Sequence, residues 1–207
     1  MEIMNAKNNK LSLAKEIAWF ESLIHACMDK YFNGETFNVA DASLQPPDLS
    51  SDHSNYSYII DYYKFGYKER IILMLALIPH IKPHVLDVFF TRNNSYDKTF
   101  TEFGGVKGNN HTGFLPTVET AAFLIAGNNL DNRFNLLSLL HEKNYLRKHN
   151  IIVLDSSGEN EPFFSRPLRI SKEYLAFLTT GNQYKPEFSS SFPASLLTTQ
   201  FTWSDLV

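Results

Sequence analysis

Two histidines are the first candidates for chemistry in this sequence, because their spacing could suit metal binding. His80 and His84 are four residues apart, the separation that places two metal ligands on one face of a helix. Pro79 and Pro83 interrupt such a helix, however, and no third Cys, His or carboxylate follows at a recognisable spacing. We therefore expect both histidines to be structural, and the sequence predicts no metal site.

A catalytic nucleophile is equally hard to find. His111 has no nucleophile or carboxylate tied to it in sequence, and a hairpin turn explains the serines of Asp155-Ser156-Ser157-Gly158. The chain has no GxSxG, HExxH or CxxC motif. We expect the segment to be non-catalytic, and a small hydrolase that uses His111 is the function that the sequence favours least.

The Gly-rich stretch FGGVKGNNHTG, residues 103–113, raises the question of phosphate binding. A P-loop needs a Lys followed directly by Ser or Thr at the start of a helix, whereas Lys107 is followed by Gly108. The stretch is therefore predicted to be a mobile surface loop, and no cofactor is expected in this chain.

Composition narrows the class of protein further. The 207 residues are 43% hydrophobic with a net charge of −3, which suits one good core but gives no basic field for nucleic acid or anionic membranes. The single Cys27 fits a reducing compartment and a packing role. The longest apolar run, Ile71–Ile78, is far shorter than the roughly 20 residues of a membrane span. We expect a cytoplasmic protein without a membrane partner.

Two helical segments are predicted in the first half of the chain. Apolar residues recur at three- and four-residue intervals over 11–32, and an irregular stretch follows to residue 55. Residues 1–55 are therefore interpreted as an N-terminal helical arm with a linker. Residues 68–78 are apolar nearly all round, which predicts a central buried helix that Pro79 ends, and Pro83 opens a short further helix.

The second half indicates a helix-turn-helix followed by a β-wing. Pro116 begins a helix that Gly127 ends, and Thr117 with Thr120 does not match a capping box. Asp131 is predicted to cap a second helix running to about Lys143. Strands at 151–153 and 168–170 flank a turn at 155–158, and a closing helix covers 172–178. The predicted fold is mainly α with a small β-wing: a winged helix-turn-helix over 56–181, with 182–207 as a linker.

The outward face of the second helix decides between two functions. With buried Leu136, Leu137, Leu139 and Leu140 on one side, the outward residues are Phe134, Asn135, Ser138, His141 and Glu142. DNA-reading helices present Arg, Lys, Asn and Gln there, whereas an outward Phe is typical of a protein contact. We therefore predict a protein-interaction face.

The second possible function is that of a DNA-binding transcriptional regulator. It would use the nearby cations Arg133, Arg147, Lys148, Arg166 and Arg169. Residues 131–172 hold seven Lys or Arg against five Asp or Glu, so few phosphates could be neutralised and binding would be weak.

Several motifs also resemble a known family. KERIILMLALIPHIKPHVLDVFF, LPTVETAAFLIAG, NRFNLLSLLHEKNYLRKHNIIVL, SRPLRISKEYLAFLTTG and the final FTWSDLV are similar to the N-terminal region of certain bacterial AAA-family ATPases, over about residues 67–207. In that family a winged-helix domain precedes the ATP-binding module. The resemblance implies a non-catalytic adaptor that binds a protein partner or its own ATPase module. ATP, Mg²⁺ and oligomerisation would then belong to a module beyond Val207.

Overall fold

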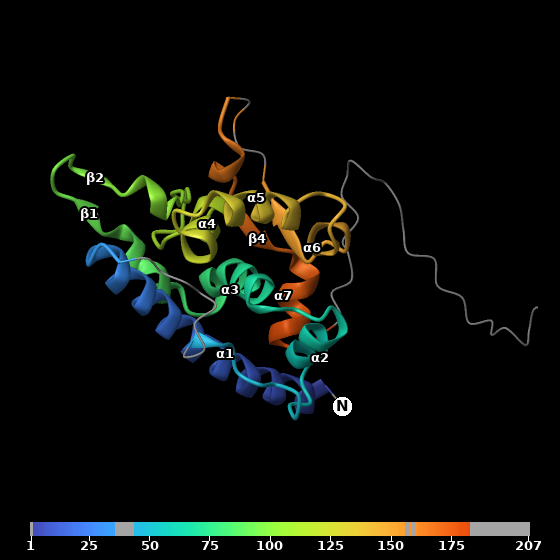
Figure 1. Ribbon diagram of the computed structural model, residues 1–207. Coiled ribbons are helices and arrows are strands. Elements are labelled where there is room, and N and C mark those ends of the chain that lie inside the picture. The colour runs from blue at the N-terminus through green and yellow to red at the C-terminus, as the bar shows by residue number, and fades with distance from the viewer. Residues whose placement is uncertain (1, 36–43, 156–157, 159, 183–207) are drawn as a thin grey trace, which may run out of the picture.

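The computed structural model of the protein describes residues 2–35, 44–155, 158 and 160–182, and it is mainly helical with two small antiparallel sheets (Figure 1). In chain order the elements are α1 (Glu2–Phe32), α2 (Asn55–Tyr62), α3 (Tyr67–Ile81), the 3₁₀ helix η2 (Pro83–Phe90), β1 (Arg92–Asn93), β2 (Lys98–Thr99), η3 (Thr101–Phe103), α4 (Val118–Ala126), α5 (Leu130–Leu139), α6 (Tyr145–Lys148), β3 (Ile152–Leu154), η4 (Phe163–Ser165), β4 (Leu168–Ile170) and α7 (Lys172–Thr179). The predicted linker beyond residue 182 and Ser156-Ser157 lie outside the described residues.

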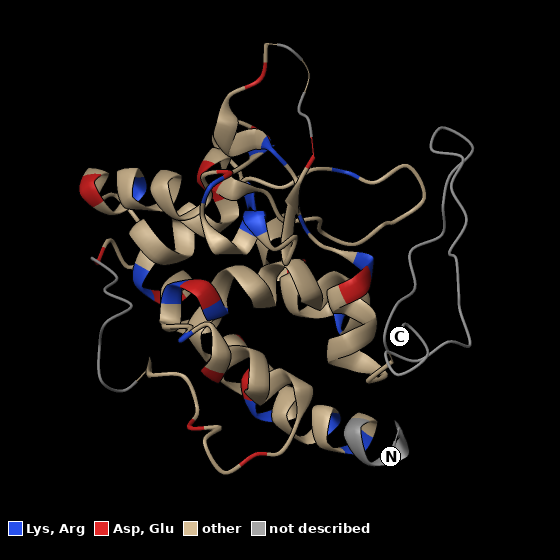
Figure 2. Ribbon diagram, turned by 90° about the vertical axis from the view of Figure 1, so that its right-hand side faces the viewer, with Lys and Arg blue, Asp and Glu red and all other residues tan. Residues whose placement is uncertain are grey.

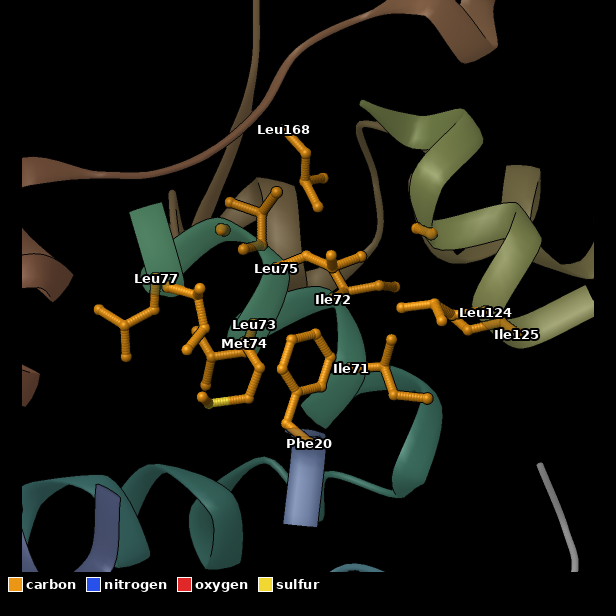
Figure 3. Close-up of a cluster of buried hydrophobic side chains, with 14 of the residues drawn as sticks. Phe20, Ile71, Ile72, Leu73, Met74, Leu75, Leu77, Leu124, Ile125 and Leu168 are labelled. Carbon is orange, nitrogen blue, oxygen red and sulfur yellow. The ribbon is translucent and has the colours of Figure 1, made fainter. Parts of the chain in front are cut away.

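Helix α3 is the centre of the core, as its apolar sequence predicts. Every residue from Ile71 to Ile78 is buried, because other elements cover the helix on several sides. Phe20 of α1, Leu124 of α4 and Leu168 of β4 gather around it (Figure 3). The β3–β4 sheet, α4 and α1 therefore share one hydrophobic core.

The expected end of α3 at Pro79 is wrong. The helix continues to Ile81, and the chain bends by 106° into η2 around Lys82, whose φ of −155° is not helical. Pro79 has no N–H to donate to the carbonyl four residues earlier, and the helix ends two residues after it. Among the described helices, none alone is long and apolar enough to span a membrane, although the bent pair α3 and η2 passes that test together by length and composition.

Helix α1 is part of this core and not a separate arm. Trp19, Phe20, Leu23 and Ile24 are at most 8% exposed, and α1 packs against α2, α3 and α7. The helix is also longer than the predicted 11–32, since it begins at Glu2. The apolar stripe visible in the sequence is covered by segments that the sequence pattern could not locate.

Polar side chains fix α1 against the rest of the fold. The fully buried Asn9 donates a hydrogen bond of 3.0 Å from Nδ2 to the carbonyl of Phe177 in α7, and its Oδ1 accepts from the N–H of Tyr56 at 3.2 Å. Glu16 is fully buried as well and pairs with Arg70 of α3. Such paired groups allow one register of α1, because any shift would leave a buried polar atom without a partner.

Strands β3 and β4 form the predicted hairpin, with Ile152 opposite Ile170 and Leu154 opposite Leu168. The chain just before α4 adds to the free side of β4. The N–H of Leu168 donates to the carbonyl of Pro116 at 2.9 Å, and the N–H of Val118 donates to the carbonyl of Arg166 at 3.0 Å. This pairing anchors the start of α4 to the hairpin.

The Gly-rich segment, 103–113, lies between the β1–β2 hairpin and α4. Val106 in this segment forms an isolated antiparallel β-bridge with Leu115, just after it. The prediction that Thr117 and Thr120 do not form a capping box is wrong, because the hydroxyl of Thr120 accepts a 3.1 Å hydrogen bond from the N–H of Thr117. A Thr thus takes the place that Glu or Gln has in a standard capping box.

Candidate protein-interaction site

Helix α5 is held at the surface by a tight turn after α4. Gly127, with φ of +49°, ends α4, and its N–H donates to the carbonyl of Ala122. Asn129 then caps α5, because its side-chain oxygen accepts a 2.9 Å hydrogen bond from the N–H of Asn132. The predicted cap, Asp131, is wrong by two residues and lies instead in the first turn, where its charge suits the helix dipole.

One side of α5 packs against α4. Leu136 and Leu140 are at most 2% exposed, and Leu139 is partly buried. Leu137 was expected on this side but is 36% exposed. At about 100° per residue it lies only about 60° from the outward Phe134, so it falls beyond the edge of the buried arc.

The outward side carries three apolar residues, which we call the α5 stripe. Leu130 is 64% exposed, Phe134 is 60% exposed and Leu137 completes the stripe. They are spaced four and three residues apart, so they share one face of the helix. Sequence reasoning identified only Phe134, because it started the helix at Asp131 and thereby left Leu130 in the turn.

The other residues predicted for this face are all exposed. Asn135 and Ser138 lie on α5, whereas His141 and Glu142 follow the end of the helix at Leu139. The Nδ1 of His141 accepts a 3.2 Å hydrogen bond from the N–H of Lys143, which holds the turn after α5. The helical part of the face is therefore shorter than the predicted 131–143.

Arg133 is turned away from solvent. Its guanidinium donates two hydrogen bonds, of 2.8 and 2.9 Å, to the two carboxylate oxygens of Glu119 in α4. The same group lies 4.5 Å from the ring centre of Phe164 in η4. Arg133 thus joins α5 to α4 and to the base of the hairpin, and its charge is already balanced.

Two further candidate DNA contacts are also engaged by carboxylates. Arg147 is 19% exposed, lies 3.8 Å from Glu142 and donates to the carbonyl of Leu140 at 3.4 Å. Arg169 pairs with Asp155 across the β3–β4 hairpin. Neither guanidinium is therefore presented as an uncompensated charge.

The last two candidate DNA contacts, Arg166 and Lys148, have different surroundings. The guanidinium of Arg166 lies 5.1 Å from the ring centre of Phe163, and its Nε is buried without a partner among the described residues. Lys148, the last residue of α6, is exposed. In the ribbon of Figure 2, Lys and Arg positions are interspersed with Asp and Glu positions along the described chain. Of the five candidate DNA contacts, Arg133, Arg147 and Arg169 each lie beside a carboxylate.

The histidines do not combine into a metal site. His80 lies in α3 and His84 in η2, so they do not share a helix face. Partial burial lowers the pKa of His80, and the positive charge of Arg169 and the nearby His111 lower it further. His84, Asp87 and His111 line a cavity of about 480 Å³. Within the described ranges, no group of three or more His, Cys, Asp or Glu is placed to hold a metal ion.

A larger cavity, of about 540 Å³, lies where the Gly-rich segment, the start of α4 and the hairpin base meet. Gly104, Gly105, Thr117, Glu119 and Phe164 contribute to its lining. Glu119 is already bonded to Arg133. The lining also includes Ser165 and a second carboxylate, Glu161.

Comparisons with protein-family models, with curated proteins and with solved structures find no match to this chain.

Proposed function

We propose that this chain is the non-catalytic, N-terminal winged-helix adaptor domain of an AAA-type ATPase. It binds a protein partner or its own ATPase module through the α5 stripe. The observation that carries the proposal is the exposed Phe134, flanked by Leu130 and Leu137, beside an arginine that is turned inward to Glu119. Exposed aromatic and aliphatic side chains that form a row are typical of protein contacts.

The order of elements supports the winged-helix part. Between α3 and α4 lie η2, β1, β2, η3 and residues 116–117, which pair with β4. Helix α4 is followed by the tight turn, α5, the short α6 and then the β3–β4 hairpin. A winged helix-turn-helix requires this order of helix, turn, helix and hairpin. In such an arrangement α5 has the position of the recognition helix.

The electrostatics favour a protein over DNA as the partner. Binding to phosphates draws its strength from cations that release counterions. Arg133, Arg147 and Arg169 are each near a carboxylate, and the whole chain has a net charge of −3. Each of these carboxylates would have to be displaced, or would repel a phosphate.

The natural reading frame beyond Val207 provides the first experiment. We expect it to encode a GxxxxGK[ST] motif, and the polypeptide encoded there can be produced separately and titrated against this chain by calorimetry. Phe134→Ala is expected to weaken that binding by about tenfold or more, because a central aromatic residue carries much of an interface. Tyr58→Ala is the matched control, since Tyr58 is also 60% exposed but lies on α2. A stop codon after Val207 contradicts the ATPase assignment.

A titration with duplex DNA at roughly 50 mM and 200 mM salt tests whether the chain is instead a DNA-binding regulator. We expect weak binding with a shallow salt dependence, measured by fluorescence anisotropy. Tight binding that falls steeply with salt, and that is lost in Arg147→Ala with Lys148→Ala, would establish the regulator.

A further inference from the structure

The outward face of α5 is nearly symmetric about Phe134. Leu130 lies four residues before it and Leu137 three residues after it; Asp131 lies three before and Ser138 four after. At about 100° per residue, the two leucines fall within about 20° of each other on one side of Phe134. Asp131 and Ser138 fall equally close together on the other side. All five residues are exposed.

This symmetry means that the face complements itself in one orientation. If a second α5 lies antiparallel, about a two-fold axis at Phe134, the two phenylalanines meet at the centre. Leu130 of each copy then meets Leu137 of the other, and Asp131 of each copy meets Ser138 of the other. An isologous contact of this kind is the commonest way in which identical chains pair.

The chemistry of each pairing is favourable. Leucine meets leucine, and the Ser138 hydroxyl can donate to the Asp131 carboxylate, which has no ion pair among the described residues. The apolar spacing of four and then three residues is the seam that a second helix fills in coiled coils. Arg133, beside the stripe, is neutralised by Glu119, so two copies bring together no unpaired like charges there.

We infer that the α5 stripe is occupied by a second copy of this chain, in an antiparallel α5–α5 contact centred on Phe134. The inference rests on the proposed function, because it names the partner of the same face. Three apolar side chains per copy make an interface much smaller than the usual 20–30 residues per side. The dimer is accordingly weak and depends on concentration.

Sedimentation equilibrium of this chain from roughly 10 µM to 1 mM measures the association directly. The expected result is an average mass that rises from one copy toward two. Phe134→Asp should remain a single copy throughout, since it buries two facing carboxylates at the centre. Tyr58→Asp, an equally exposed position on α2, should associate like the unmodified chain. Circular dichroism confirms that each variant is folded.

A pair of charge changes tests the antiparallel register. Ser138→Glu places a second carboxylate opposite Asp131 at two points of the contact, and should weaken the dimer about tenfold. Adding Asp131→Lys to Ser138→Glu makes both points oppositely charged, and should restore association to at least its original strength. Asp131→Lys alone should change it less than Ser138→Glu alone.

The outcomes separate this inference from the proposed function. A single copy at every concentration, or a dimer that survives Phe134→Asp, overturns the inference. A dimer that Phe134→Asp abolishes but the double charge change does not restore overturns the antiparallel register. If self-association fails while Phe134→Ala still weakens binding of the polypeptide encoded after Val207, the proposed function stands and the partner of the stripe is that polypeptide.

Discussion

Glu16 of α1 and Arg70 of α3 form an ion pair inside the protein. The Nε of Arg70 donates to Oε1 of Glu16 at 2.7 Å, and Nη2 donates to Oε2 as well as to the carbonyl of Pro47. The two side chains are 0% and 7% exposed. Because both charges are out of water, each depends on the other for its compensation.

Removing one partner of this pair should be costly. Glu16→Ala leaves the Arg70 guanidinium buried and unpaired, and should lower the free energy of unfolding by about 3–5 kcal/mol in urea titrations. Replacing both residues by Met should cost clearly less, since no buried charge remains. A double variant less stable than Glu16→Ala contradicts this account. Lys64→Ala, which breaks a fully exposed pair with Asp61, is the control and should change stability little.

Asp52 should make stability depend on acid pH. Its carboxylate accepts a 2.7 Å hydrogen bond from Lys15 and a 2.9 Å bond from Ser12, and the Lys15 bond is the main cause of its lowered pKa. A lowered folded-state pKa gives stability that is present above about pH 4, the ordinary Asp value, and is lost as pH falls through the folded value. Asp52→Asn should remove about 1 kcal/mol at pH 7 and much less at pH 2. Equal losses at both pH values contradict the assignment.

Cys27 should be inert in the folded protein. It is 2% exposed, as its predicted packing role requires, and burial raises the pKa of its thiol to about 12. Since the thiolate is the reactive form, we expect no reaction with a disulfide reagent at pH 8 on the time scale of minutes. One equivalent should react at once in denaturing urea. Rapid labelling under native conditions would show that α1 opens readily.

Gly105 should resist substitution for two reasons. Its φ of +87° is left-handed, and a Cβ there would overlap the ring of Phe114. Gly34 is the matched control, because its φ is +71° but a Cβ would meet nothing within 4 Å. Gly34→Ala should cost about 1 kcal/mol of backbone strain, and Gly105→Ala should cost at least 1–2 kcal/mol more. Equal losses in thermal unfolding would mean that Phe114 moves aside freely.

Features set by neighbouring residues were predictable from the sequence. The apolar run of 71–78 correctly predicts the buried α3, and Gly127 correctly predicts the end of α4. The β3–β4 hairpin follows from alternating residues such as Leu168 and Ile170 around a turn. The apolar run of α3, the glycine after α4 and the alternation in each strand are each local patterns that can be recognised without knowing the tertiary partner.

Features set by distant residues were not predictable. Asn9 and Phe177 are 168 positions apart and no periodicity links them, so the sequence alone predicts a separate arm at α1. In the sequence, Arg133 is a candidate DNA contact of the alternative function, because its partner Glu119 lies on another helix, 14 positions away. The prediction that Leu137 is buried is wrong for a different reason. Leu137 lies at the edge of the buried side of α5, and its exposure there depends on how closely α4 approaches α5.

The hydrogen bond from Asn9 to Phe177 brings the first and last helices of the described fold together at one pole. In Figure 1 that pole lies at the bottom, where α7 descends to α1 and α2, whereas α5 lies in the upper half. A fluorophore or affinity handle attached to α1 or α7 at this pole would sit on the side remote from α5. Surface immobilisation through such a handle should therefore leave the α5 stripe accessible to a binding partner.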